Sequence, residues 1–330
     1  MESKKKFTPD PSLKLMDQVR QVLRYHHYSY KTEHAYCNWI LRYLKFHGGK
    51  KHPRAMGKKE IEQFLSHLAG DGNVSASTQR QALNALVFLY RHVLDIPIDE
   101  ELEHSRSKRH PRIPIVLTQQ EVKSVLDQMQ GIHLLMAKLL YGGGLRLMEC
   151  VRLRVGDLDF EREKLYIRDG KGGKDRVTLF PKSIHEDLQI QLGNVKKLHD
   201  QDLSNGYGSV YLPNALARKY PSAAREFCWQ YIFPSRNLSQ DPRTGKIRRH
   251  HVLESGLQKA VKTAVKKAGI VKRVGCHTFR HCFATHLLEN GANIRVVQKL
   301  MGHADVKTTE IYTHVMEKNI DDLHSPLDLL

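Results

Sequence analysis

The chain has 330 residues, of which 53 are Lys or Arg and 35 are Asp or Glu, so its formal net charge is +18 and its pI is about 9.6. This positive charge predicts a polyanionic partner, because basic surfaces attract phosphates and release their counterions. An anionic membrane surface is the competing interpretation. No apolar run approaches the roughly 18–20 residues needed to span a bilayer, which excludes an integral membrane protein.

The start of the chain and its cysteines favour a cytoplasmic protein. The segment Met1–Lys6 is followed by no apolar stretch of the kind found in signal peptides, so secretion is not expected. The cysteines are odd in number and none belongs to a Cys-x-x-Cys pair, which disfavours a disulfide framework and a zinc ribbon. They are Cys37, Cys150, Cys228, Cys276 and Cys282.

Four stretches between residues 12 and 100 repeat apolar side chains at helical spacing, with short connections between them. The pattern predicts a bundle of four amphipathic helices, which we assign to an N-terminal domain of residues 1–102. Ser77 is the expected N-cap of the fourth helix. The four groups are Leu15, Val19, Val22 and Leu23; Tyr36, Trp39, Ile40, Tyr43 and Leu44; Ile61, Phe64, Leu65 and Leu68; and Leu83, Leu86, Tyr90 and Val93.

A change of composition separates this domain from a second one. Residues 103–114 are polar, basic and interrupted by two prolines, so they read as a linker. The second domain, 115–330, opens with a capping box, Thr118–Glu121, ahead of a helix. The next helix ends at Gly142–Gly144. These glycines are either a plain helix–helix corner or a corner that also lets Arg146 project toward a phosphate from the start of the following helix.

The rest of the second domain is expected to be mostly helical, with one small antiparallel sheet. Residues 164–168 and 176–180 alternate as two strands around a glycine-rich turn that carries Lys171 and Lys174. Residues 203–251 are irregular and rich in Pro, aromatic and basic residues. Helices are predicted at 184–198, 253–268, 277–290 and 294–301, with Asn293 as the cap of the last.

A cluster of phosphate-binding residue types lies near the end of the chain. A tyrosine hydroxyl is a weak nucleophile, and it reacts only where the charge around it is neutralised. Arg280 can bind two phosphoryl oxygens with its planar fork, and it lies off the apolar stripe of its helix. His277 and His303 can each donate one more hydrogen bond. This pattern favours attack of Tyr312 on a phosphodiester.

A metal site is the alternative interpretation of the two histidines in this helix. His277 and His281 are four residues apart, so they lie on one helix face, where two metal ligands often occur. No carboxylate or cysteine completes a convincing third ligand. We therefore predict no metal.

Five motifs in order identify the chain as a member of the tyrosine recombinase (phage integrase) family, by resemblance along its whole length. They are Arg146, the hairpin with Lys171, His277-x-x-Arg280, Leu-x-Gly-His303 and Tyr312. The resemblance implies a mainly α, two-domain fold: an N-terminal four-helix DNA-clamping domain, a basic linker, and a mostly α catalytic domain with a small antiparallel sheet.

A narrower set of segments resembles the integron integrases. The insert at about 203–251 is similar to the extra segment of that subfamily, and residues 28–36 and 325–328 also resemble it. This resemblance implies a bacterial, nucleoid-associated enzyme that integrates and excises gene cassettes. It would do so on folded single-stranded hairpin sites, which it recognises more by their extrahelical bases than by sequence.

The family resemblance also implies the role of each catalytic residue. Tyr312 attacks the scissile phosphate and forms a 3′-phosphotyrosyl bond, which conserves bond energy, so no ATP is required. Arg146 and Arg280 neutralise the non-bridging oxygens of the transition state, and His303 donates a further hydrogen bond. The two arginines replace the charge that metals supply in phosphatases, so no cofactor is expected.

Three further residues receive supporting roles from the same resemblance. Lys171 is expected to be the general acid that protonates the leaving 5′-oxygen. His277 is expected to assist proton transfer at the tyrosine. Glu149 is a candidate for orienting the arginines.

The insert offers flat surfaces on which an unpaired base can stack. Each such stacking contact contributes about 1–3 kcal/mol to binding. The alternative is that the aromatic residues, Trp229 and Tyr231 above all, form the core of an enlarged domain. The stacking candidates are Trp229, Tyr231, Pro234, Pro242, His250 and His251, and Arg248, Arg249 and Lys174 are further candidates for DNA contact.

The C-terminal segment 319–330 carries several apolar residues after the tyrosine. In the family this tail docks on a neighbouring protomer, so the resemblance implies a homotetramer around two DNA sites. A tail without a docking role is the alternative.

Three other functions compete with a cassette recombinase. A Xer-like or phage-type recombinase would act on duplex sites, and the insert argues against it. A type IB topoisomerase shares the chemistry but relaxes supercoils as a monomer. A DNA-binding architectural protein would keep the fold without the chemistry, and the presence of every catalytic residue type argues against that.

Overall fold

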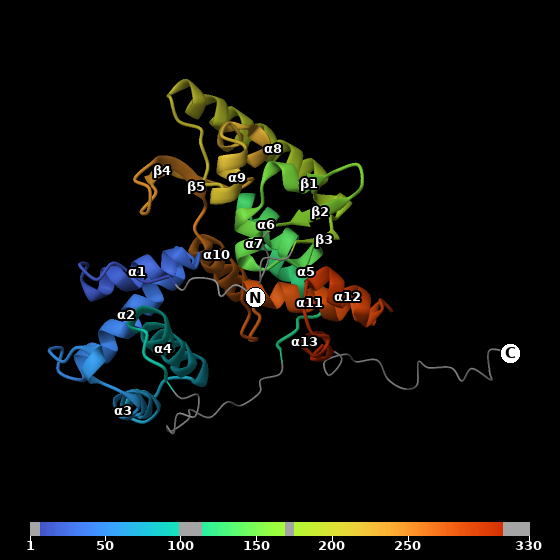
Figure 1. The fold of residues 1–330 in the computed structure, drawn as a ribbon. Helices are drawn as coiled ribbons and strands as arrows, with labels where there is room; N and C mark the ends of the chain where they lie inside the picture. Colours follow the sequence, from blue (N-terminus) through green and yellow to red (C-terminus); the bar gives the residue numbers. More distant parts are fainter. Residues whose placement is uncertain (1–6, 99–113, 169–174, 313–330) are drawn as a thin grey trace, which may run out of the picture. The chain divides into compact units, whose positions relative to one another are not determined.

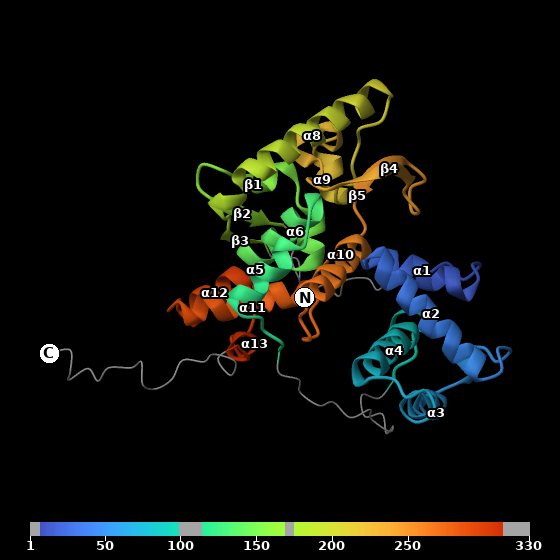
Figure 2. The ribbon, with the colours of Figure 1, turned by 180° about the vertical axis from the view of Figure 1, so that it is seen from behind.

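The structure, a computed structural model, describes residues 7–98, 114–168 and 175–312, and it divides the chain into two compact units, residues 1–112 and 113–330 (Figures 1 and 2). Both units are mainly helical, and the second contains small antiparallel sheets. This confirms the predicted fold class. In the part of the chain that is described, no helix has the length and apolar character needed to cross a membrane.

The first unit contains the four predicted helices around one apolar core. Ser75, not Ser77, caps the fourth helix: its side chain accepts the Thr78 amide, and Ser77 lies inside the first turn. The buried Tyr43 and Tyr90 hydroxyls hydrogen-bond each other at 2.8 Å across the core. The helices are α1 Leu15–Tyr25, α2 Tyr30–Phe46, α3 Lys58–Ala69 and α4 Ala76–Phe88, which continues as a π-helical turn Leu89–Leu94, and a short 3-10 turn covers Pro53–Ala55.

The second unit begins with helices whose predicted caps are present. The Thr118 hydroxyl accepts the Glu121 amide, and the Glu121 carboxylate accepts the Thr118 amide, so the capping box forms. Asn293 likewise accepts the Arg295 amide at the start of its helix. The helices are α5 Gln119–Asp127, α6 Gly131–Gly142, α7 Leu147–Arg152, α8 His185–Ser204, α9 Asn214–Lys219, α10 Glu254–Lys267, α11 Cys276–Glu289, α12 Ile294–Met301 and α13 Lys307–Glu310.

The predicted hairpin is part of a three-stranded antiparallel sheet with strand order β1-β2-β3. The strands are β1 Leu158–Asp159, β2 Lys164–Ile167 and β3 Arg176–Leu179. Ile167 pairs with Arg176, so the turn that carries Lys171 and Lys174 leaves the sheet at this pair. The turn itself, 169–174, lies outside the described residues. The Thr178 hydroxyl donates to the Gly143 carbonyl at 2.8 Å and fixes β3 to the end of α6.

The insert, predicted as irregular, contains a second antiparallel pair of strands, β4 Pro234–Gln240 and β5 Ile247–His251, in addition to α9. It has a small core of its own, formed by Val210, Leu212, Ala223 and Tyr231. In Figures 1 and 2 the insert lies beside α8, at the opposite end of the unit from α11, α12 and α13.

Two close approaches fix the geometry around α11 and α12. Gly144, after α6, has φ +62°, and a Cβ there would lie 2.3 Å from the Phe283 ring of α11. Gly302 also has φ +62°, ends α12, and would place a Cβ 2.7 Å from the Cδ of Arg176. Only glycine fits both the conformation and the space at these two positions. They let α6, α11, α12 and β3 converge on one site.

Candidate functional site

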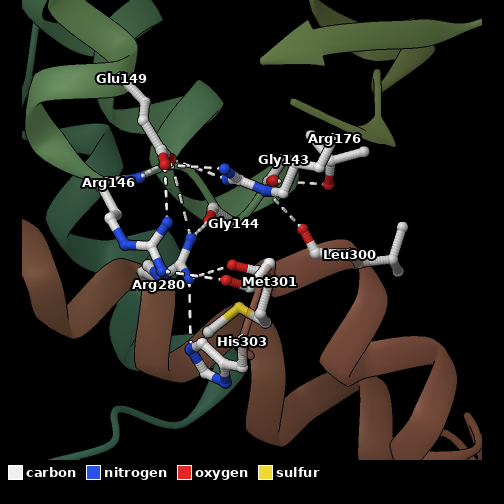
Figure 3. A network of polar contacts seen from close by, with 11 residues as sticks. Gly143, Gly144, Arg146, Glu149, Arg176, Arg280, Leu300, Met301 and His303 are labelled. Atoms are coloured by element: carbon white, nitrogen blue, oxygen red, sulfur yellow. Dashed lines mark hydrogen bonds and ion pairs between the residues drawn. The ribbon is translucent and has the colours of Figure 1, made fainter. Parts of the chain in front are cut away.

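Arg280 is at the centre of this site. It lies on α11 with a side chain that is 1% exposed, and it is among the largest fully buried side chains of the described chain. Its guanidinium donates to the carbonyls of Gly144 and Met301 and lies 3.3 Å from Nε2 of His303 (Figure 3). Burial lowers the pKa of Arg280 to about 9, which leaves it charged at neutral pH. The fold therefore holds a fixed, desolvated cation here.

Arg146 is the residue before α7, where the sequence predicted it. Its backbone amide donates to Oε2 of Glu149, and its Nη1 donates to Oε1 of the same carboxylate, both at 2.7 Å. Its Nη2 reaches the Gly302 carbonyl at 3.5 Å. Met301 is the last residue of α12 and Gly302 is the next residue. Arg280 binds the Met301 carbonyl and Arg146 reaches the Gly302 carbonyl, so both arginines meet the C-terminal end of that helix (Figure 3).

The Glu149 carboxylate contacts both Arg146 and Arg176. Burial alone raises its pKa, but the hydrogen bonds and charge of Arg176 and the contacts of Arg146 outweigh burial and lower the pKa to about 2. Its side chain is 8% exposed. Glu149 is therefore a fully ionised, buried carboxylate in a cluster of cations.

Arg176 belongs to this cluster, although the sequence pattern indicated only that it lies in a strand. Its two terminal nitrogens each donate to one oxygen of Glu149 at 2.7 Å, and its Nε donates to the Leu300 carbonyl at 2.9 Å. Its side chain is 7% exposed. A charged residue in a short strand next to a basic turn was the only signal in the sequence, and it does not distinguish a buried arginine from a solvated one.

His303 follows α12 and faces the same cations. Its Nδ1 lies 2.9 Å from the Thr309 hydroxyl, while Nε2 faces Arg280. Burial, and then the nearby charges of Arg280 and Arg146, lower the pKa of His303 to about 4. The neutral imidazole carries one N–H, and the Arg280 and Thr309 contacts restrict where its ring can point.

Tyr312 is buried beside these residues, with 2% of its surface exposed. Burial raises its pKa, while the charges of Arg280 and Arg146 act in the opposite direction. Its hydroxyl lies 3.0 Å from Nδ1 of His281. Its ring packs in a small apolar cluster formed with Phe283, Ala284, Leu288, Val297 and Met301.

His281, rather than His277, therefore contacts the tyrosine hydroxyl in this structure. The two imidazole rings lie 4.5 Å apart at a near-perpendicular angle on α11. Burial, and then the charges of His277 and Arg280, lower the pKa of His281 to about 4; burial and Arg280 also lower that of His277. Across the described residues, no group of three or more His, Cys, Asp and Glu is placed to hold a metal ion.

Several predicted residues fall outside the described part of the chain. Lys171 and Lys174 lie in the turn between β2 and β3, and the tail 319–330 follows the last described residue. The base of the turn is placed, because Arg176 is its first residue on β3 and belongs to the arginine cluster.

The structure separates the insert residues into buried and exposed groups. Tyr231 and His251 are each 5% exposed, so neither ring is available for a base to stack on in this conformation. Arg249 donates to both oxygens of Asp202 at 2.5 and 2.7 Å, which ties β5 to α8. Burial lowers the pKa of His251 to about 4. These three residues hold the insert together.

The second group is at least partly exposed, and within it Trp229 also packs against the insert core. His250 and Pro242 are exposed, and Trp229, Pro234 and Arg248 are partly exposed. The Arg248 guanidinium lies 3.3 Å from an Asp241 oxygen.

Arg154, which the sequence did not single out, holds Trp229 in place. It donates to the Trp229 carbonyl, and its guanidinium lies 5.9 Å from the Trp229 ring centroid and 4.7 Å from that of Tyr231. Arg168 also lies over the Trp229 ring, at 5.4 Å. The indole is therefore bordered by two cations.

The arrangement at α11 and α12 suits phosphoryl transfer to a side chain. Three guanidinium groups surround one carboxylate, so the site keeps a net positive charge that can attract a phosphate. Arg280 offers guanidinium donors from a fixed, desolvated position, where electrostatic stabilisation of developing charge is strongest, and His303 lies beside it. The Tyr312 ring stacks at 6.4 Å on that of His303, and its hydroxyl lies 3.0 Å from Nδ1 of His281.

Comparison with known proteins gives matches over both units. The phage integrase family matches residues 116–319, and its N-terminal SAM-like domain matches residues 15–100. A protein of Escherichia coli named integrase/recombinase is 46% identical over 324 residues, which cover 98% of this chain and 95% of that protein. The tyrosine recombinase XerD of Oceanobacillus iheyensis is 30% identical over 292 residues, covering 86% of each.

Solved structures agree on the fold. A lambda integrase dimer bound to a COC′ core site is similar with a TM-score of 0.59 at 16% identity, over 94% of this chain and 79% of that one. The XerH recombinase bound to its difH substrate gives a TM-score of 0.58 at 19% identity, over 90% and 81% of the two chains.

Proposed function

We propose that this chain integrates and excises gene cassettes by acting on folded single-stranded sites with extrahelical bases. The chain belongs to the phage integrase family and is a site-specific tyrosine recombinase that cuts and rejoins DNA. The reaction type follows from the chemistry of the family. The substrate is the new element of the proposal, and it depends on the insert at 203–251.

The catalytic part rests on one observation: Tyr312 is buried with its ring stacked 6.4 Å from that of His303, whose Nε2 lies 3.3 Å from the Arg280 guanidinium. Its oxygen attacks the scissile phosphorus and forms the 3′-phosphotyrosyl bond, while the bond to the 5′-oxygen breaks. Arg146, Arg280 and His303 stabilise the charge on the non-bridging oxygens. His277 assists removal of the tyrosine proton, with His281 positioned at the hydroxyl.

Lys171 protonates the leaving 5′-oxygen in this proposal. Lys171→Ala should therefore cleave normal DNA slowly but recover on DNA whose leaving 5′-oxygen is replaced by sulfur, because a thiolate leaves without protonation. Single-turnover cleavage of both substrates measures the recovery. Lys174→Ala is the matched control from the same turn. Recovery for Lys174→Ala but not for Lys171→Ala would assign the acid to the other lysine.

The substrate part rests on the exposed surface of the insert. Trp229 presents a partly exposed indole bordered by Arg154 and Arg168, and His250 and Pro242 are exposed on or beside the β4–β5 hairpin. Flat rings next to fixed cations suit an unpaired base attached to a phosphate backbone. The His250 ring lies 4.0 Å from that of His251 and 5.6 Å from that of Tyr231.

Trp229→Ala should weaken binding of a folded cassette-site strand by roughly 5- to 150-fold, the loss expected for one base stack of about 1–3 kcal/mol. Binding of the same strand without its extrahelical bases should change much less, because it offers no base to stack. Binding of both strands is measured across a salt series, since lost phosphate contacts would also reduce the salt slope. Trapping of the covalent adduct on the same strands reports recombination chemistry.

Trp229→Phe is the control, because phenylalanine keeps a flat ring and most of the packing. His250→Ala tests a second surface that does not lie in the insert core. Equal losses on both strands would mean that the insert is structural or purely electrostatic, and the enzyme would then be a recombinase of duplex sites. Relaxation of a plasmid without any recombination site would instead indicate topoisomerase activity.

A homotetramer forms around two DNA sites, with residues 319–330 docking on a neighbouring protomer. The basic charge of +18 supports binding to DNA in general. A DNA substrate places the enzyme in the bacterial cytoplasm, at the nucleoid.

A further inference from the structure

Arg176 joins three segments that come from distant parts of the sequence. It is the first residue of β3, its guanidinium binds Glu149 of α7, and its Nε donates to the Leu300 carbonyl near the end of α12 (Figure 3). Its side chain also packs under Gly302, where no larger residue fits. Arg176 therefore links β3 to both α7 and the end of α12.

Arg176 occupies the acceptor sites of the Glu149 carboxylate that Arg146 leaves open. Oε1 accepts from Nη1 of Arg146 and from Nη1 of Arg176; Oε2 accepts from the Arg146 amide and from Nη2 of Arg176, all at 2.7 Å. A carboxylate has about four acceptor sites, so none is left. Arg280 lies 3.9 Å from Oε2, within ion-pair range but beyond hydrogen-bonding distance.

This arrangement bears on phosphate binding. A buried carboxylate with two open acceptor sites would compete with DNA for the nearest guanidinium, because a paired arginine–carboxylate contact is strong and geometrically specific. Arg280 is the nearest candidate, and its other contacts are carbonyls and an imidazole, which carry no full negative charge. The residue that occupies the remaining acceptor sites of the Glu149 carboxylate therefore determines whether Arg280 keeps a donor for the substrate.

We infer that Arg176 is a positioning residue for strand cleavage: it saturates Glu149, so that Arg280 and the remaining donors of Arg146 stay available to the scissile phosphate. The inference rests on the proposed binding of phosphate by Arg146 and Arg280. Arg176 also fixes the base of the lysine-bearing turn to the end of α12, which keeps the two sides of the site in register. Arg176 itself does not contact the substrate.

The test compares single-turnover cleavage of a suicide DNA by four full-length proteins: wild type, Arg176→Met, Glu149→Gln and the double variant. The DNA is the folded cassette-site strand or, if that is not cleaved, the duplex site that traps the wild type. Arg176→Met should bind DNA normally but cleave about 100-fold more slowly, the size of effect that a small misplacement of catalytic groups produces. The double variant should cleave at least tenfold faster than Arg176→Met, because the neutral amide no longer captures Arg280.

A purely structural role would give the opposite pattern. Loss of the anchor to Leu300 is not relieved by Glu149→Gln, so the double variant would then be as slow as Arg176→Met or slower, and the inference would be wrong. Normal cleavage by Arg176→Met would also overturn it. If Arg176→Met does not fold, Arg176→Lys replaces it in both backgrounds, because lysine keeps the charge but cannot fill both oxygens; the same order of rates is required.

Two controls separate this inference from the proposal beneath it. Lys164→Met, an exposed residue of the same sheet, should cleave at the wild-type rate. Arg280→Ala reports the proposed phosphate contact: if it cleaves normally, the proposed catalytic roles fail. If Arg280→Ala is inactive while Arg176→Met is normal, only the role of Arg176 fails.

Discussion

Tyr312→Phe should abolish the covalent protein–DNA adduct on a suicide substrate while leaving DNA binding nearly unchanged. Only the nucleophilic oxygen is removed, and the ring keeps its apolar contacts with α11 and α12. The lost hydrogen bond to His281 is a single contact, typically worth about 1 kcal/mol. Denaturing gel electrophoresis detects the adduct, and a mobility-shift titration measures binding.

Tyr141→Phe is a matched control for this experiment. Tyr141 also hydrogen-bonds a histidine, His286, at 2.9 Å in the same unit, so the substitution removes a similar contact without touching the proposed nucleophile. Its adduct should form at the wild-type level. An adduct that persists in Tyr312→Phe would reject Tyr312 as the nucleophile. EDTA should leave the wild-type adduct unchanged, and a strict metal requirement would point instead to the His277 and His281 pair.

Arg280→Ala should lower the cleavage rate by at least about 10²–10³-fold, the loss seen when one preorganised donor is removed from an electrostatic site. The substitution also leaves the Gly144 and Met301 carbonyls without their donor, so some stability is lost as well. Single-turnover cleavage at saturating DNA measures the chemical effect, and thermal unfolding measures the structural one.

Arg280→Lys separates the two effects. Lysine keeps the charge but cannot donate as a fork to two carbonyls and a phosphate, so its cleavage should fall between the wild type and the alanine variant. If both variants cleave at the wild-type rate while remaining folded, Arg280 does not bind the scissile phosphate. If they lose cleavage only in proportion to the unfolded fraction, Arg280 is a structural residue.

The sequence predicted best those features that depend on neighbouring residues. The Thr118 capping box and the Asn293 cap were correct, because a helix start is set by a few adjacent side chains. The strands on either side of the glycine-rich turn were also correct. The prediction of Ser77 as the cap was wrong by two residues. Ser75 and Ser77 carry the same hydroxyl group, and only the path of the backbone selects between them.

Long-range contacts account for most of what the sequence did not predict. Arg280 lies off the apolar stripe of its helix, yet ten residues of α11 are buried and Arg280 is one of them. The partners of Arg280 and Arg176 are carbonyls and a carboxylate more than twenty residues away, and no local pattern specifies them. The contact between His281 and Tyr312 has the same origin.

The insert shows a second limit of sequence reasoning. Strands β4 and β5 carry many polar residues and a register shift between Pro234 and Leu238, so they lack the regular alternation that identifies a strand. Tyr231 and His251 are as aromatic as Trp229 and His250, but the first pair is buried and the second is not. Composition names the candidates for base stacking, and only the fold selects among them.

The two tryptophans of the chain lie in different units, and this separation has an optical consequence. Trp39 is 7% exposed in the N-terminal bundle, where its Nε1 donates to Gln81, while Trp229 is partly exposed in the insert between two guanidinium groups. Intrinsic fluorescence is therefore the sum of a shielded emitter and a solvent-accessible one. Removing either indole leaves a single-site signal, so the two halves of the enzyme can be followed independently in one cuvette without an attached dye.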